Sequence, residues 1–350
     1  MKILFFTIGT RVYPSSRTRV YGYLPYLERE GISFKVINLV SQKQTEYNLR
    51  MEGVDIISRI CEKAYNLKNA LKVMLLCRRY DIVFLQKILL PRILLNMIKV
   101  FNRRIVFDFD DAVYISSAKD RGRFINTVRS SRLVIASTEF LAKEARRYND
   151  NVTTIPTSID IDKYKMKKRD TPNCKYTIVW IGTPAAVKYL DRIKDVFIKI
   201  VGSYKDKVKI RLIGADRFAT GDPLTDSHIE LVKWAEDTEA DEISSGDTGI
   251  MPMQSDNWSI GKAGYKLIQY MGASLPVLSD ANVVSEKIID DGTDGFLLKD
   301  DTGWFDKFSL LIENRKMGEK MGAAGRKKAE REYSYKSNFR RFYDCLKNCM

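Results

Sequence analysis

Three aspartates follow an apolar run in the first half of the chain. Asp108, Asp110 and Asp111 stand in the sequence FDFDDA, at the end of a predicted strand over residues 104–109. Ligands of α/β folds bind at the carboxyl ends of parallel strands, so these carboxylates are candidates for ligand contact. Asp108 and Asp110 form a D-x-D pair that could hold a divalent cation on a diphosphate. Alternatively, the aspartates cap the next turn, and Asp110 or Asp111 meets hydroxyl groups or basic neighbours.

A glycine turn connects the first predicted strand with a helix. It reads TIGT and then PSSRTR, and its candidates for holding a phosphate are Gly9, Ser16, Arg17 and Arg19. Free N–H groups at a helix N-terminus favour anions, and the arginines add positive charge. Ser16 could equally be a helix N-cap. The turn is not G-x-G-x-x-G, so the dinucleotide fingerprint is absent.

A second glycine turn, WIGTPAAVK, follows a strand in the second half of the chain. Gly182 and Thr183 form the turn, and Lys188 comes six residues after Gly182, at the predicted start of a helix. Backbone amides and an ammonium group at this place could hold a diphosphate together. The alternative is that Lys188 is an ordinary exposed helix lysine.

A third block, GKAGYKLIQYMGASLPV, predicts a helix that starts at Gly264. Its candidate ligand contacts are Lys262, Gly264, Tyr265, Lys266 and Gln269. Lys266 and Gln269 are three residues apart and therefore share one face of the helix.

Apolar runs that alternate with helical patterns surround these motifs. The predicted strands cover residues 2–7, 34–40, 81–86, 104–109, 132–137, 153–156, 177–181, 208–213, 229–232, 248–251, 275–279 and 295–298. The predicted helices cover residues 19–30, 64–80, 92–102, 138–148, 187–201, 264–271 and 336–346. This alternation indicates βαβ units, and hence an α/β protein with doubly wound parallel sheets.

A length of 350 residues favours two domains rather than one. The polar, basic stretch 162–175 is the predicted linker. We expect an N-terminal Rossmann-like domain over 1–165, a C-terminal one over 176–335, and a terminal helix in 336–350 that could pack back on the first. A single histidine, His228, removes most metal-site templates, and five scattered cysteines without a CxxC pair indicate a reducing compartment.

The positive charge is confined to the first half of the chain. Residues 1–170 hold 32 Lys and Arg against 17 Asp and Glu, whereas residues 171–350 hold 27 of each. A basic half suggests an anionic partner, such as a membrane surface, a phosphorylated ligand or nucleic acid. A merely solubilising surface is the alternative.

The chain resembles glycosyltransferase family 4. The resemblance rests on SSRTR, FDFDDA, STEFL, IPTSID, GTPAAVK and GYKLIQYMGASLPV, followed by Glu286 and by DGTDGF from Asp291. It implies the GT-B fold, in which two Rossmann-like domains face a cleft, and transfer of a sugar from a nucleotide diphosphate-sugar with retention of configuration. It further implies donor binding by the second domain, acceptor binding by the first, and no metal or other cofactor.

The chain departs from the family at several positions. The family has arginine where Thr183 follows Gly182, which leaves Lys188 as the expected diphosphate cation. Its two glutamates fall on Gly261 and Gln269, so Gln269 could bind a ribose hydroxyl while Gly261 offers no carboxylate. We therefore assign the catalytic roles to Asp110, Asp111 and Lys188.

Family members with lipid-linked acceptors dock on the inner membrane surface through the first domain. Two basic segments with apolar stripes, 63–79 and 92–104, are candidates for such docking. We expect a cytoplasmic protein, peripheral on the inner face of the membrane, that acts on a glycan or lipid-linked acceptor in surface polysaccharide assembly and binds no nucleic acid. The alternatives are a metal-dependent transferase that uses Asp108 and Asp110, and a basic nucleic-acid-binding protein.

Overall fold

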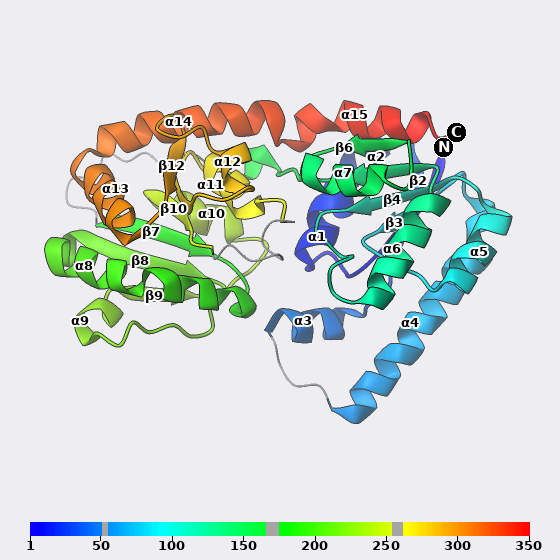
Figure 1. Cartoon of the computed structure of the whole chain (residues 1–350), viewed down its shortest axis with the longest axis horizontal. Helices are drawn as coiled ribbons and strands as arrows, with labels where there is room; N and C mark the ends of the chain where they lie inside the picture. Colours follow the sequence, from blue (N-terminus) through cyan, green and yellow to red (C-terminus); the bar gives the residue numbers. More distant parts are fainter. Residues whose placement is uncertain (51–54, 166–174, 254–261) are drawn as a thin grey trace. The chain divides into compact units, whose positions relative to one another are not determined.

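The computed structural model describes residues 1–50, 55–165, 175–253 and 262–350 (Figure 1). These residues form two compact units. The first comprises Met1–Ser158, Lys262, Ala263 and Tyr335–Met350, and the second comprises the other described residues between Ile159 and Ser334. The first unit ends shortly before the predicted boundary at residue 165, and most of the predicted linker, 162–175, lies outside the described residues.

The first unit is built on a parallel sheet of six strands in the order β2-β1-β3-β4-β5-β6. The strands are β1 (Lys2–Thr7), β2 (Ser33–Asn38), β3 (Ile82–Gln86), β4 (Ile105–Phe109), β5 (Leu133–Ala136) and β6 (Val152–Thr154). Successive side chains of β1 enter two different apolar clusters, with Leu4 in one and Ile3 in the other. The sheet is therefore buried on both faces, which explains its continuous apolar strands.

Helices cover both faces of this sheet (Figure 1). They are α1 (Pro14–Ser16), the π-helical turn η1 (Arg17–Tyr21), α2 (Leu24–Arg29), α3 (Gln42–Arg50), α4 (Ile56–Leu76), the 3-10 turn η2 (Cys77–Arg79), α5 (Arg92–Phe101), α6 (Ala118–Ser130), α7 (Glu139–Arg146) and α15 (Tyr335–Lys347). The last of these joins the unit from the far end of the chain. Its Phe342 ring stacks on Tyr23 with centroids 4.4 Å apart, and its Tyr335 lies where a Cβ on Gly22 would be.

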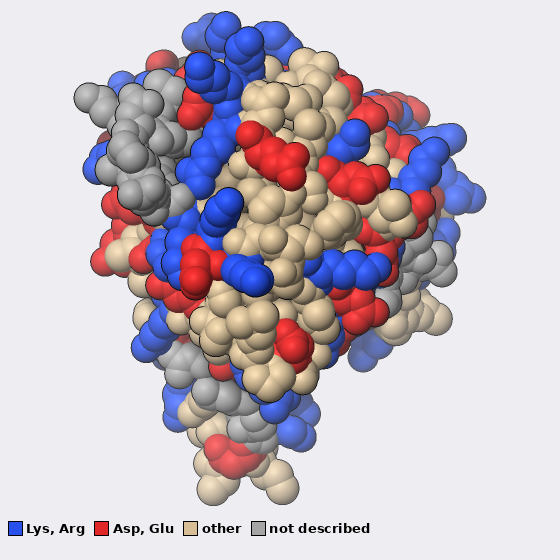
Figure 2. All heavy atoms as spheres, turned by 90° about the vertical axis from the view of Figure 1, so that its left-hand side faces the viewer, with Lys and Arg blue, Asp and Glu red and all other residues tan. Residues whose placement is uncertain are grey.

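The second unit repeats the plan with strands in the order β12-β11-β10-β7-β8-β9, all parallel. The strands are β7 (Tyr176–Ile181), β8 (Val208–Ile213), β9 (Ile229–Val232), β10 (Thr248–Met251), β11 (Val277–Asp280) and β12 (Gly295–Leu298). The helical segments are η3 (Ile161–Lys163), η4 (Pro184–Ile193), α8 (Lys194–Tyr204), η5 (Lys205–Lys207), α9 (Pro223–Asp226), α10 (Glu239–Ser244), α11 (Tyr265–Gly272), α12 (Ser285–Ile288), α13 (Asp301–Glu313) and α14 (Arg315–Glu332). On the side of the molecule that Figure 2 shows, basic and acidic side chains are intermingled.

The predicted fold class is confirmed, because both units are parallel six-stranded sheets with alternating helices. The single helix predicted over 19–30 is wrong. The chain leaves η1 at Gly22, which packs under Tyr335, and α2 restarts with Pro25 in its first turn. The prediction also missed α6, α13 and α14. No helix among the described residues combines the length and the apolar character needed to cross a bilayer.

Candidate functional site

The glycine turn after β1 is closed by bonds within the protein. The Gly9 N–H donates to Ser16 Oγ at 3.2 Å, and the Ser16 hydroxyl donates to Gln86 Oε1 at 3.0 Å. Ser16 is fully buried inside α1, whose N-cap is Tyr13, so it is not the N-cap that the sequence allowed. The predicted phosphate contacts of Gly9 and Ser16 are therefore corrected: both groups connect β1, α1 and β3.

Arg19 and Asp108 form a buried ion pair. The Arg19 Nε donates to Asp108 Oδ1 at 3.1 Å and Nη2 donates to Oδ2 at 2.5 Å, while Nη1 donates to the Ile155 carbonyl at 2.7 Å. The two side chains are 2% and 0% exposed. Burial alone would lower the pKa of Arg19, but the attraction of Asp108 outweighs it and raises that pKa.

This pair corrects two expectations from the sequence. Arg19 does not present its guanidinium to a phosphate, because all its nitrogens donate within the first unit. Asp108 likewise does not join Asp110 in an open D-x-D site, since Arg19 occupies both of its oxygens. Of the predicted phosphate loop, Arg17 alone stays partly exposed in the structure.

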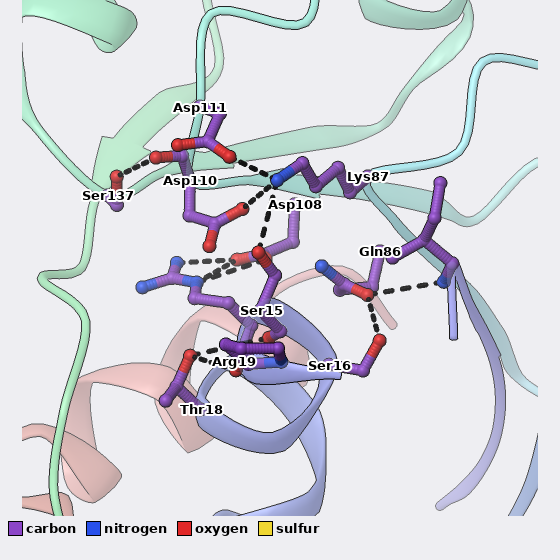
Figure 3. A network of polar contacts seen from close by, with 12 residues as sticks. Ser15, Ser16, Thr18, Arg19, Gln86, Lys87, Asp108, Asp110, Asp111 and Ser137 are labelled. Atoms are coloured by element: carbon purple, nitrogen blue, oxygen red, sulfur yellow. Dashed lines mark hydrogen bonds and ion pairs between the residues drawn. The ribbon is translucent and has the colours of Figure 1, made fainter. Parts of the chain in front are cut away.

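Asp110 and Asp111 lie at the end of β4, where Lys87 points toward both (Figure 3). The Lys87 Nζ lies 3.4 Å from Asp110 Oδ1 and contacts Asp111 Oδ2. It also donates to Ser15 Oγ at 3.1 Å. Burial would lower the pKa of Lys87, but the two carboxylates outweigh this effect and raise it. Burial raises the pKa of Asp111, and the attraction of Lys87 opposes that shift.

The sequence reasoning missed Lys87. It stands directly after the predicted strand 81–86, and β3 pairs with both β1 and β4, so its position was available from the strand order. The residue after a strand at the carboxyl edge of a parallel sheet is a usual place for ligand contacts. The acidic motif after β4 was predicted as a site, whereas Lys87, which follows the neighbouring strand β3, was not.

In the second unit, Gly182 and Lys266 come together at the end of β7. The Lys266 Nζ lies 4.3 Å from the centroid of the Trp180 ring. A Cβ built on Gly182 would come within 2.4 Å of that ring and within 2.8 Å of the Lys266 Nζ. Glycine at 182 thus leaves room for the ammonium beside the turn.

Gly264 sets the start of α11, on which Lys266 lies. Gly264 has φ of +64° and precedes the helix as its N-cap, a conformation that favours glycine. A Cβ there would lie 2.2 Å from Ile288 Cδ1. The N-terminus of α11, which begins at Tyr265, therefore brings Lys266 to the turn after β7, and the partial positive charge of a helix N-terminus adds to that of the ammonium.

Tyr270 fixes α11 against the sheet. Its hydroxyl accepts a hydrogen bond from the Ile181 N–H and donates to the Ile250 carbonyl, both at 3.0 Å. Its ring lies where a Cβ on Gly249 would be. One side chain therefore connects β7, β10 and α11, and it holds Lys266 in register with Gly182.

The remaining predicted donor contacts lie in different settings. Thr183 is the N-cap of η4, and Lys188 is exposed, with its Nζ 5.3 Å from the Tyr189 ring centroid. Gln269 is 2% exposed, and its amide donates to Glu239 Oε1 at 2.8 Å and to Tyr164 Oη at 3.1 Å. A ribose contact through that amide would require one of these bonds to be exchanged.

Two predicted positions lie in and beside the segment that the structure leaves out. Gly261, which stands at a family glutamate position, lies outside the described residues. Lys262 is counted with the first unit, and its charge lowers the pKa of Asp111, after the larger effects of burial and Lys87.

Known proteins resemble both the second unit and the whole chain. Residues 175–314 match the model of the family described as glycosyl transferases group 1. No curated protein sequence matches the chain significantly. Solved structures are similar over the whole chain: HepE of Anabaena in complex with UDP has 13% identity and a TM-score of 0.69, and covers 99% of this chain and 100% of its own.

Two further structures show the same similarity. The glycosyltransferase of Rickettsia africae has 13% identity and a TM-score of 0.71, with 99% of this chain and 98% of that chain covered. Sucrose-phosphate synthase of Thermosynechococcus elongatus has 10% identity and a TM-score of 0.69, with both chains covered completely. The chain thus has the GT-B fold, and the group 1 match over its second unit makes it a glycosyltransferase. The nucleic-acid-binding alternative is set aside.

Proposed function

We propose that this enzyme is a retaining glycosyltransferase of family 4 type, which takes its sugar from a UDP-sugar bound by the second unit. One observation carries the proposal: Lys266 lies beside Gly182 at the carboxyl end of β7, at the N-terminus of α11. An ammonium and a helix N-terminus at one place form a diphosphate site. The group 1 match covers residues 175–314 of this unit, and the similar HepE was solved with UDP.

In this proposal Lys266 and Lys188 stabilise the negative charge that develops on the leaving diphosphate. Stabilisation of developing charge by preorganised groups is the largest single term in many enzymes. The departing phosphate oxygen accepts the proton of the acceptor hydroxyl, because the family glutamates are replaced here. Asp110 and Asp111 bind the acceptor, a glycan or lipid-linked sugar of surface polysaccharide assembly.

The proposed reaction requires no metal. The alternative of a metal-dependent transferase would need a divalent cation on Asp108 and Asp110, but both oxygens of Asp108 accept hydrogen bonds from Arg19. Asp110 and Asp111 both form ion pairs with the ammonium of Lys87, which lies where a metal bound to them would have to compete. Lysines at the turn after β7 would neutralise the diphosphate in place of a metal.

We further propose that the enzyme works in the cytoplasm, attached to the inner membrane surface through α4 and α5. Among the described residues, eleven of the 17 exposed large apolar side chains lie on these two packed helices, including Ile57 and Ile93, which are 74% and 75% exposed. Exposed basic side chains accompany them: Lys63, Lys68, Lys72, Arg78, Arg79, Arg92, Lys99, Arg103 and Arg104. Apolar residues beside basic ones suit an anionic lipid surface.

A panel of nucleotide sugars tests the donor site. Thermal melting of the full chain with UDP, GDP and their glucose and N-acetylglucosamine derivatives should show stabilisation by uridine nucleotides, and sugar release or transfer should identify the donor. Stabilisation by GDP with none by UDP would reassign the base. Stabilisation by no nucleotide would overturn the proposed donor site.

A further inference from the structure

The carboxyl edge of the first sheet holds a cation that no part of the proposed mechanism requires. Lys87 has φ of +60°, the left-handed region that residues with a side chain rarely adopt. Its N–H donates to the Asp108 carbonyl at 2.7 Å, which ties the end of β3 to β4. If only the turn mattered, glycine or asparagine would fit it with less strain. The cost of the left-handed backbone indicates that the lysine side chain itself is needed here.

The ammonium of Lys87 lies among three polar groups. It donates hydrogen bonds to Asp111 Oδ2 and Ser15 Oγ, and it forms an ion pair with Asp110 Oδ1 at 3.4 Å. The Tyr13 ring lies on another side, with its centroid 5.9 Å from the Nζ. The side chain is only 10% exposed. Because the ammonium is nearly buried and lies next to both aspartates, its charge acts mainly on these two carboxylates.

The two carboxylates differ in access. The Asp110 side chain is 9% exposed and that of Asp111 is 27% exposed. One ammonium between two carboxylates leaves one negative charge uncompensated within the trio. Asp111 is the more accessible of the two, so it can accept a hydrogen bond from a hydroxyl group outside the cluster, whereas little of the Asp110 side chain reaches the surface.

We propose that Lys87 is a positioning residue, which orients Asp111 and keeps it ionised so that this carboxylate receives an acceptor hydroxyl. The proposal rests on the proposed function for the identity of the acceptor as a hydroxyl compound. In this proposal the two adjacent aspartates have different roles. Asp111 contacts the acceptor, and Asp110 pairs with the ammonium of Lys87. The cluster thereby selects neutral hydroxyl donors over anionic groups at this point.

Loss of the Lys87 charge should leave two adjacent carboxylates without the cation between them, and neighbouring carboxylates do not both ionise easily. Lys87→Asn removes the charge and tolerates the left-handed backbone, because asparagine adopts it readily. Lys87→Arg retains the charge. The charged and titratable groups that face Asp111 are Lys87, Asp110, Lys262 and Tyr13, with the Arg19–Asp108 pair behind them.

The test follows the Asp111 carboxyl by carbon-13 NMR in the full chain labelled at aspartate, with the signal assigned through Asp111→Asn. We expect its titration midpoint to move to higher pH in Lys87→Asn, to stay near that of the wild type in Lys87→Arg, and to move to lower pH in Asp110→Asn. An unchanged midpoint in Lys87→Asn and Asp110→Asn would overturn the proposal. Asp110→Asn keeps the test decisive if Lys87→Asn does not fold.

Transfer kinetics with the donor found by the panel provide the second measurement. Lys87→Asn should lower kcat/KM for the acceptor by about tenfold or more, most strongly at low pH, and Lys87→Arg should restore much of it. The affinity for UDP should be unchanged, because the nucleotide site lies in the other unit. If UDP fails to bind the wild type, the proposed function fails whatever Asp111 does. If UDP binds and kcat/KM is unaffected in Lys87→Asn, only the role of Lys87 fails.

Discussion

The ammonium of Lys266 lies over the ring of Trp180, 4.3 Å from its centroid, although one residue belongs to α11 and the other to β7. The Trp180 ring is fully buried, so it is a fixed surface for the cation. A cation over an aromatic face is attracted by the ring quadrupole, typically by about 0.5–2 kcal/mol. The contact holds Lys266 at the glycine turn, where a diphosphate would meet it.

Removal of either donor-site lysine should weaken nucleotide binding. A charge-assisted hydrogen bond contributes about 1.5–3 kcal/mol, so Lys266→Ala and Lys188→Ala should each reduce UDP affinity roughly ten- to a hundredfold. Isothermal titration calorimetry measures the change. Lys199→Ala, which removes an exposed lysine from α8, is the matched control and should bind UDP like the wild type. Unchanged affinity in both variants would move the diphosphate elsewhere.

A methyl group at residue 182 should displace Lys266. The added Cβ of Gly182→Ala would lie 2.8 Å from the Lys266 Nζ and 2.4 Å from the buried Trp180 ring. We expect a loss of about 1–3 kcal/mol in the free energy of unfolding and a fall in UDP affinity like that of Lys266→Ala. Gly202→Ala in α8, where a Cβ meets no atom within 4 Å, should instead raise stability by up to about 1 kcal/mol. Equal behaviour of the two variants would contradict the close packing at Gly182.

Removal of one partner of the Arg19–Asp108 pair should strongly destabilise the first unit. Arg19→Met leaves an unpaired buried carboxylate, which typically costs about 3–5 kcal/mol. Urea unfolding should show this loss, and the double variant Arg19→Met/Asp108→Leu should recover part of it, since no charge is then stranded. Arg103→Met, at an exposed arginine, is the control. A single variant as stable as the wild type would show that the pair is open to water, and Asp108 would again be available to a metal.

Transfer should proceed without a divalent cation. In the proposed mechanism Lys266 and Lys188 supply positive charge to the diphosphate, and both oxygens of Asp108 accept hydrogen bonds from Arg19. We expect the rate of transfer in excess EDTA to equal the rate with added magnesium or manganese. Activity that is lost with EDTA and recovered with metal would favour the D-x-D mechanism over the one proposed.

The local order of the chain was well predicted because parallel strands in this fold are continuous apolar runs. Strands β1, β8, β9, β10 and β12 begin and end where the sequence placed them. The path around Gly22 could not be predicted, since it depends on Tyr335, which lies at the other end of the chain. The predicted phosphate contact of Arg19 is wrong for a similar reason. The local sequence places Arg19 beside a glycine turn, but its partner Asp108 comes from a strand that is distant in the sequence. Lys87 was not predicted as a site residue, because its position beside the aspartates depends on β3 and β4 being neighbours in the sheet.

The last prediction concerns attachment to a membrane through α4 and α5. Polybasic attraction contributes about 1 kcal/mol per Lys or Arg near an anionic surface and decays over a Debye length of roughly 8 Å at physiological salt. The exposed apolar side chains of these helices, such as Ile57 and Val100, should add a component that resists salt. Vesicles with anionic lipid should therefore sediment the protein at low salt and release much of it at high salt, and neutral vesicles should bind far less.

Two sets of four substitutions distinguish the effect of the basic residues in and beside α4 on vesicle binding from the effect of the overall net charge. Replacement by Gln of Lys68, Lys72, Arg78 and Arg79 should lower vesicle binding without changing UDP affinity, because the proposed nucleotide site lies in the other unit. The control replaces four exposed lysines of the second unit, Lys199, Lys207, Lys233 and Lys299, and removes the same net charge. The control should bind vesicles like the wild type, since its residues lie outside α4 and α5, which carry most of the exposed large apolar side chains of the described residues. Equal losses in the two sets would mean that overall charge alone drives binding. Equal binding of the wild type to neutral and anionic vesicles, or binding to neither, would leave the basic half of the chain to a soluble anionic acceptor.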